Sequence, residues 1–352
     1  MGHWYCAGAG PAAALRGRPL VCSAFLATLA LATTAALPAQ ALTITPSFDS
    51  SITSNANASA IEGAINMAIG TIDGLFANPV NITVTFTYDA AAPGNLESTV
   101  QTFYGYSYSS YTKALAADAA ANPQNTVLAT AVANLSKGND ANGRGSMAIT
   151  GAQSILLSAY GLGTSGASDA VININKNQAF AFSRPVSSSQ FDAVGGLEHE
   201  LDEVLGGGGA GSTLNPRAGS CQTTPNGFFC NKFGATDLYR YSAAGTPSFS
   251  TSGTATAYLS VDGGTTDIVG FNQDPAGDYG DFAPNCGTGG GTRELIQNAF
   301  NCKGQDEAYT TASPEFAMLE AIGWDPVPEP ETLALFAGAV IGIVTLRRRA
   351  IG

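Results

Sequence analysis

Two apolar stretches, one at each end of the chain, limit what this sequence can fold into. Near the N-terminus basic residues precede an apolar stretch from about 19 to 37, and an A-x-A site follows at 39–41. This order is typical of a secretory signal peptide and predicts that residues 1–41 are removed. A short membrane anchor that is never cleaved is the alternative. The folded part is expected to begin at Leu42.

The C-terminal stretch is shorter and ends in arginines. It reads V-P-E-P-E at 327–331, then an apolar run from Leu333 to Leu346, then three arginines. This order resembles the PEP-CTERM sorting signal of Gram-negative bacteria. The resemblance implies export, an exosortase-type sorting enzyme as a partner, removal of the tail near 328–330, and a final place at the cell surface or in the extracellular matrix. As a transmembrane helix the apolar run would be roughly 21 Å long, which suits a transient inner-membrane anchor better than a lasting one.

The charge balance is acidic, with 15 Lys and Arg against 27 Asp and Glu and a formal net charge of −12. Five of the basic residues lie in the two terminal signals, so the exported part is more acidic still. This composition argues against nucleic acid and anionic lipid as partners. It leaves room for divalent cations.

Four cysteines lie between the terminal signals: Cys221, Cys230, Cys286 and Cys302. An even number in an exported protein predicts two disulfides. Proximity favours Cys221 with Cys230 and Cys286 with Cys302. A Zn(Cys)4 site is the alternative, although no C-x-x-C spacing supports it.

Apolar spacing predicts helices and strands in alternation. The expected elements, in chain order, are a helix over 56–76, a strand over 80–88, two helices over 109–135 broken at Asn122-Pro123, a polar loop over 137–145, a strand over 170–175, a helix over 191–205 closed by four glycines, a short strand over 255–261 and a helix over 314–324 that ends at Gly323. From about residue 212 the sequence pattern changes and predicts short strands separated by turns rich in Gly, Asn and Asp.

The segment 195–206, G-G-L-E-H-E-L-D-E-V-L-G, holds the only histidine outside the predicted leader. As a helix it places His199 and Glu203 four residues apart on one face, with Glu200 rotated away from them. This is the H-E-x-x-H arrangement of zinc peptidases with a carboxylate in place of the second imidazole. It predicts His199 and Glu203 as Zn²⁺ ligands, and Glu200 as the base that takes a proton from water.

A third ligand must come from outside the motif. Gly206 stands where the metzincin motif H-E-x-x-H-x-x-G-x-x-H has its glycine, but Gly209 stands where that motif has its last histidine. The candidates are Asp237 and the acids within 262–281, which are Asp262, Asp267, Asp274, Asp278 and Asp281. For those acids, solvated surface turns and a contribution to a Zn²⁺ or Ca²⁺ site both stay open.

Several blocks around the motif together resemble a family of exported bacterial proteins described as metalloproteases, many with PEP-CTERM tails. The blocks are H-E-L-D-E-V-L-G at 199–206, D-L-Y-R-Y-S at 237–242, A-Y-L-S-V-D-G-G-T-T at 257–266, F-N-Q at 271–273, G-D-Y-G-D-F at 277–282 and L-E-A-I-G-W-D at 319–325. The resemblance covers about residues 190–325. It implies that glutamate at the second ligand position is a family trait.

The resemblance also implies the fold, an α+β, zincin-like (metzincin-like) catalytic domain with a β-rich, disulfide-containing C-terminal part. The expected organisation is a signal peptide (1–41), an N-terminal zincin-like half with the motif helix (42–211), a β-rich C-terminal half of the same domain or a subdomain (212–326) and the sorting signal (327–352).

Two functions fit these observations. The first is an exported, zinc-dependent metalloendopeptidase-like hydrolase that acts on a protein or peptide. The second is a non-catalytic cell-surface or biofilm-matrix protein on a zincin-like scaffold, which binds Ca²⁺ or polysaccharide. A chance H-E-x-x-E on a solvated acidic helix face, and His199 as the base of a serine or cysteine triad, are further alternatives.

Overall fold

The computed structural model describes residues 41–92, 94–135, 145–163, 170–212, 214, 232–284, 291–293, 295–307 and 309–328. These residues belong to the second of two compact units, Ala39–Gly352. Residues 1–40 of the predicted signal peptide, the polar loop before Gly145 and the apolar tail from Leu333 lie outside the described residues. Within the described part, no helix is both long enough and apolar enough to cross a membrane.

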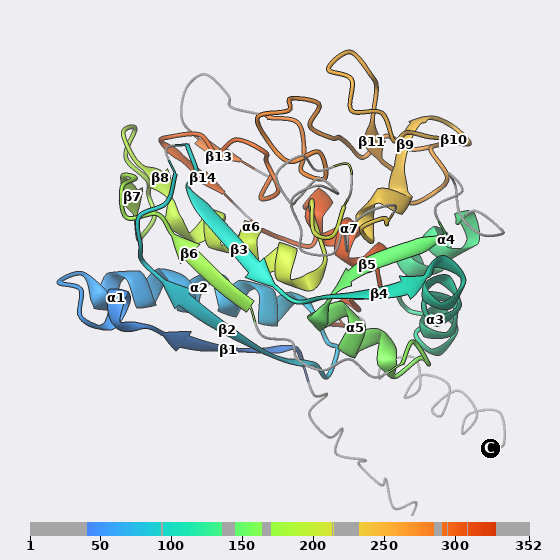
Figure 1. Cartoon of the computed structure of the whole chain (residues 1–352), viewed down its shortest axis with the longest axis horizontal. Coiled ribbons are helices and arrows are strands. Elements are labelled where there is room, and N and C mark those ends of the chain that lie inside the picture. The colour runs from blue at the N-terminus through green and yellow to red at the C-terminus, as the bar shows by residue number, and fades with distance from the viewer. Residues whose placement is uncertain are drawn as a thin grey trace, which may run out of the picture. The chain divides into compact units, whose positions relative to one another are not determined.

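A four-stranded mixed sheet lies beside the motif helix. Its spatial order is β1 (Thr43–Phe48), β2 (Asn81–Thr87), β6 (Ala170–Ile174) and β3 (Glu97–Gln101). The first three strands run parallel, and β3 pairs antiparallel with β6 at the edge of the sheet (Figure 1). The strands predicted over 80–88 and 170–175 are confirmed as β2 and β6.

Two predicted helices, α2 (Ala58–Leu75) and the motif helix α6 (Ala193–Leu205), pack against each other beside this sheet (Figure 1). Each buries an apolar stripe with helical spacing, and full burial of one such side chain contributes about 1.5–3 kcal/mol. The buried apolar residues are Ile61, Ala64, Ile65, Ala68, Ile69 and Ile72 in α2, and Ala193, Val194, Leu197, Leu201, Val204 and Leu205 in α6.

The predicted helices over 109–135 are α3 (Tyr108–Ala121) and α4 (Thr126–Asn134), with the break at Asn122-Pro123 as expected. The other elements before the glycine run are α1 (Ser50–Thr53), β4 (Phe103–Ser107), β5 (Ser146–Thr150), α5 (Gly151–Ser158), β7 (Phe180–Ala181) and β8 (Phe191–Asp192).

After the glycine run the elements are short. They are a 3₁₀-helix (Thr236–Tyr239), β9 (Arg240–Ala243), β10 (Thr246–Pro247), β11 (Tyr258–Leu259), β12 (Val269–Gly270), β13 (Gly291–Arg293), β14 (Gln305–Glu307) and α7 (Pro314–Ala321). The strand predicted over 255–261 is shorter in the structure, where β11 ends at Leu259, just before Ser260. Its hydroxyl donates to Asp262 Oδ1 and accepts from the backbone N–H of Gly264.

The mixture of helices and strands confirms the α+β class. The secondary structure alone does not distinguish a zincin-like domain from other α+β folds. Cys221, Cys230 and Cys286 lie outside the described residues, so both predicted disulfide pairings stay predictions.

The last described residues are fastened to the N-terminal half. The backbone N–H of Ala77 donates to Asp325 O at 2.8 Å, and that of Val327 donates to Leu75 O at 2.9 Å. The carboxylate of Asp325 also accepts a hydrogen bond from the side-chain amide of Asn125 at 3.1 Å. These bonds hold the chain firmly up to the start of the sorting tail.

Asp118 of α3 is fully buried beside this C-terminal segment, where Asn122 donates to its Oδ1 at 2.7 Å. The pKa of Asp118 is raised to about 7, chiefly by burial and also by repulsion from Asp325, while the hydrogen bonds from Asn122 and Tyr160 oppose the shift. A carboxyl whose pKa is higher in the folded state stabilises the fold below its unfolded pKa, and that stability is lost as the pH rises through the folded pKa.

We therefore expect the free energy of unfolding to fall between about pH 4 and pH 7, and to fall less in the isosteric variant D118N. Urea denaturation at several pH values measures this directly. The exposed carboxylate of Asp274 provides a control, since D274N is expected to keep the wild-type slope. If D118N kept the wild-type dependence of stability on pH, a raised pKa of Asp118 would be contradicted.

Candidate metal centre

The motif helix α6 begins and ends at residues that favour helix termini. The Asp192 side chain caps the N-terminus by accepting from the backbone N–H of Val194 at 3.1 Å. Gly206 ends the helix with φ 102°, a left-handed conformation that glycine adopts without strain. Between these caps, His199 and Glu203 lie one helical turn apart, as the sequence predicted.

Asp281 reaches the motif helix because glycine backbones come into close contact. A Cβ atom on Gly280 would lie only 2.5 Å from the carbonyl oxygen of Gly208 and from the Cα of Gly209. Gly208 has φ 55°, and a Cβ on it would lie 3.0 Å from Oδ1 of Asp281. The glycine run after α6 therefore leaves the space in which the loop carrying Asp281 lies.

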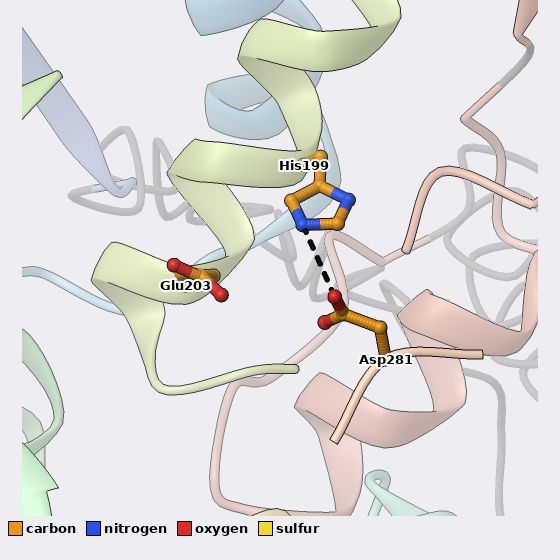
Figure 2. A group of neighbouring side chains, drawn as sticks. All are labelled: His199, Glu203 and Asp281. Carbon is orange, nitrogen blue, oxygen red and sulfur yellow. Dashed lines mark ion pairs between the residues drawn. The ribbon is translucent and has the colours of Figure 1, made fainter. Parts of the chain in front are cut away.

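Three side chains converge at this point. Nε2 of His199 lies 3.8 Å from Oδ2 of Asp281, and one candidate ligand atom from each of His199, Glu203 and Asp281 lies within 4.8 Å of the others (Figure 2). Nδ1 of His199 lies 3.0 Å from the carbonyl oxygen of Ile296. Because a carbonyl only accepts, Nδ1 carries the proton in the neutral ring, and the lone pair of Nε2 points toward the carboxylates.

Glu203 lies in a strongly anionic environment. Burial raises the pKa of its carboxyl well above the usual range, and repulsion from Glu200, Asp281, Asp278 and Asp202 raises it further. Within the described part of the chain, no side chain or backbone group donates a hydrogen bond to this carboxylate. Such a group is stabilised either by a proton or by a cation.

Glu200 is held by the edge strand. The hydroxyl of Thr99 in β3 donates to Glu200 Oε2 at 2.6 Å, and the side-chain amide of Gln101 donates to the carbonyl oxygen of Glu203 at 2.8 Å. The pKa of Glu200 is raised to about 7, chiefly by burial and also by the negative charge of Asp278, while the hydrogen bond from the Thr99 hydroxyl opposes the shift. Glu200 is thus oriented by β3 rather than by its own helix.

These groups line a cleft of about 600 Å³ between β3, α6, the loop before Phe282 and residues 298–301. Among its described lining residues are five carboxyl groups and no Lys or Arg. The carboxyls belong to Glu97, Glu200, Glu203, Asp278 and Asp281. The cleft is therefore suited to a cation, and to a substrate that is not itself anionic.

Of the predicted third-ligand candidates, the structure brings Asp281 to the motif, and it places Asp278 in the wall of the same cleft outside the group of three. Asp281 joins His199 and Glu203, whereas Asp237 accepts from the Ser212 hydroxyl and from the backbone N–H of Gly234, both at 2.9 Å. Asp262 accepts from Ser260 and Thr266 within its own turn. Among the described residues, the group with Asp281 is the one set of His, Cys, Asp and Glu side chains close enough to share a metal ion.

Sequence reasoning missed Thr99 and Gln101. The strand that carries them, E-S-T-V-Q, places polar side chains on the face toward α6, so it lacks the apolar alternation that identifies a half-buried strand. No signal in the sequence marked either residue.

The comparisons with known proteins concern the tail of the chain. Residues 326–349 match the family model of the PEP-CTERM protein-sorting motif. The chain is thus an exported protein that an exosortase-type enzyme sorts to the cell envelope or surface, in agreement with the sequence prediction. No curated protein and no solved structure is significantly similar to the chain.

The glycine contact gives a direct test of the geometry. Alanine at position 280 would place a methyl group 2.5 Å from Gly208 O, so G280A is expected to lower the free energy of unfolding by about 1–3 kcal/mol. Gly253 is the matched control, since a Cβ there meets only Gln273 O at 3.7 Å. Urea denaturation compares the two variants, and equal midpoints would show that the close approach is absent.

Proposed function

We propose that this chain is an exported, zinc-dependent hydrolase of the metallopeptidase type, with His199, Glu203 and Asp281 as metal ligands and Glu200 as the base. The observation that carries the proposal is the convergence of the three ligand atoms within 4.8 Å in a cleft that also contains Glu200.

The donor set suits Zn²⁺. Imidazole nitrogen and carboxylate oxygen are both zinc ligands, and three protein ligands leave a coordination position open, as catalytic zinc sites require. The hydrogen bond from Nδ1 of His199 to Ile296 O is the kind of outer contact that fixes a metal-binding imidazole. The half-buried carboxylate of Glu203, which has no hydrogen-bond donor among the described residues, is well suited to bind a cation.

The ion and the base have separate roles. Bound Zn²⁺ supplies a Lewis acid that polarises a carbonyl group and lowers the pKa of water. Glu200 takes the proton from the attacking water and passes it to the leaving group, and the Thr99 hydroxyl holds Oε2 for this task. Two carboxylate ligands add negative charge, so the metal is a weaker Lewis acid than in a site with two histidines.

The shape of the cleft supports a peptide as substrate. β3 is the edge strand of its sheet, bonded to β6 on one side, and its residues form one wall of the cleft. An extended peptide can add to such an edge through main-chain hydrogen bonds. A mixed sheet whose edge strand lies beside an H-E-x-x-E helix also supports the zincin-like reading of the fold.

The role of Glu200 separates metal binding from hydrolysis. In E200Q the three ligands stay, so the zinc content of the purified protein should equal that of the wild type. Hydrolysis of fluorescein-labelled casein should fall by about 10²- to 10⁴-fold, the usual contribution of a general base. Wild-type activity in E200Q would refute the hydrolase mechanism.

The role of Asp281 is tested by a pair of variants in one loop. Removing a residue that only orients a metal ligand typically weakens metal binding by about 10- to 100-fold. Loss of a ligand itself should cost more, so D281N should weaken zinc binding by at least about 100-fold. D274N changes an exposed acid of the same loop and should bind zinc normally. Tight Ca²⁺ binding with no zinc and no hydrolysis would instead favour the non-catalytic surface or matrix protein.

A further inference from the structure

Asn298 lines the same cleft and is almost completely buried, with 2% of its surface exposed. Neither Nδ2 nor Oδ1 has a hydrogen-bond partner among the described residues. Buried side-chain amides in folded proteins are nearly always bonded, because an unpaired donor or acceptor costs free energy. A side chain with both a donor and an acceptor unpaired at the wall of a cleft is a candidate for ligand binding.

The contacts around Asn298 place it beside the metal centre. His199 Nδ1 donates to Ile296 O, and the Gln297 side-chain amide donates to His199 O at 3.2 Å. On the other side, the backbone N–H of Phe282 donates to Gln297 O, and that of Ala299 donates to Phe282 O at 3.1 Å. Asn298 thus directly follows the two residues that bond His199. Its neighbours on both sides bond Phe282, the residue that follows Asp281.

The chemistry of the amide indicates what it binds. A primary amide presents one acceptor and two donors in a plane, which matches the C=O and N–H of a peptide group. The other wall of the cleft offers a second unpaired amide atom, since Gln101 Oε1 is buried without a partner among the described residues. Neither group carries a charge, so both suit the neutral backbone of a peptide.

We propose that Asn298 is a substrate-binding residue whose side-chain amide hydrogen-bonds a peptide group next to the scissile bond. This inference rests on the proposed hydrolase function and names the group that its site recognises. Sites with buried polar groups discriminate strongly against ligands that leave those groups unpaired. Asn298 therefore favours peptides over substrates that cannot satisfy both its donor and its acceptor.

Two hydroxamates test the proposal on the zinc-loaded full chain. Acetohydroxamic acid and acetyl-Gly-Leu-hydroxamate carry the same metal-binding group, but only the second carries peptide groups. Calorimetry should show that N298A weakens the peptidyl hydroxamate about ten-fold and leaves acetohydroxamic acid unchanged, as expected for the loss of one to two hydrogen bonds. N298D keeps the shape and removes the donor, so it should lose affinity in the same selective way even if N298A folds poorly.

The controls separate this role from others. N57A removes an exposed asparagine side chain that makes no cap hydrogen bond, and should affect neither probe. Equal losses for both probes, or none, would overturn the proposal, and so would loss of zinc in N298A, which would make Asn298 a metal ligand. Asn298-dependent binding of chitohexaose without binding of the peptidyl probe would favour a polysaccharide. If neither hydroxamate binds the wild type, the metal centre itself fails, and the role of Asn298 fails with it.

Discussion

The burial of an acidic helix is the constraint on which the rest of the structure depends. α6 carries four carboxylic acids, of which three are buried and Glu203 is half-buried at the cleft. A buried carboxylate needs a proton, a hydrogen-bond donor or a positive charge. Three of them find partners in other segments: Arg184 pairs with Glu198 at 3.4 Å, Thr99 donates to Glu200, and Tyr309 donates to Asp202 at 3.0 Å. Glu203 finds another acid, Asp281, and a histidine. Among the described residues, Glu203 is thus the acid of α6 to which no group donates a hydrogen bond, and a cation is its natural partner.

The glycines around α6 make this arrangement sterically feasible. Gly196 faces the edge strand, where a Cβ would collide with the Glu97 carboxylate, and Gly280 meets the glycine run on the other side. Small residues at both contacts let β3 and the Asp281 loop approach the helix from two directions. The cleft lies between them, with the Glu97 side chain against the Gly196 backbone on one side and close backbone contacts of Gly280 with Gly208 and Gly209 on the other.

The sequence predicted those features that depend on the spacing of residues along the chain. The isoleucine stripe of α2, the alternation in β2 and the cap at Gly206 all follow from periodicity and glycine conformation, so these elements and the pairing of His199 with Glu203 could be anticipated. The edge strand β3 could not, because its inward residues Thr99 and Gln101 are polar and serve α6 rather than an apolar core. The sequence narrowed the third metal ligand to several acids but could not identify Asp281 among them, since tertiary packing decides which acid meets the helix. Asn298 had no signal, because an isolated asparagine in a turn-rich region is ordinary.

The most direct measurement is anomalous diffraction at the zinc edge from crystals of the zinc-soaked protein. One strong peak is expected at a point shared by His199 Nε2 and the carboxylates of Glu203 and Asp281, at about 2.0–2.2 Å from each ligand atom. A peak at a different cluster, or none at these residues under saturating zinc, would contradict the claim that this acidic helix is built around a metal ion.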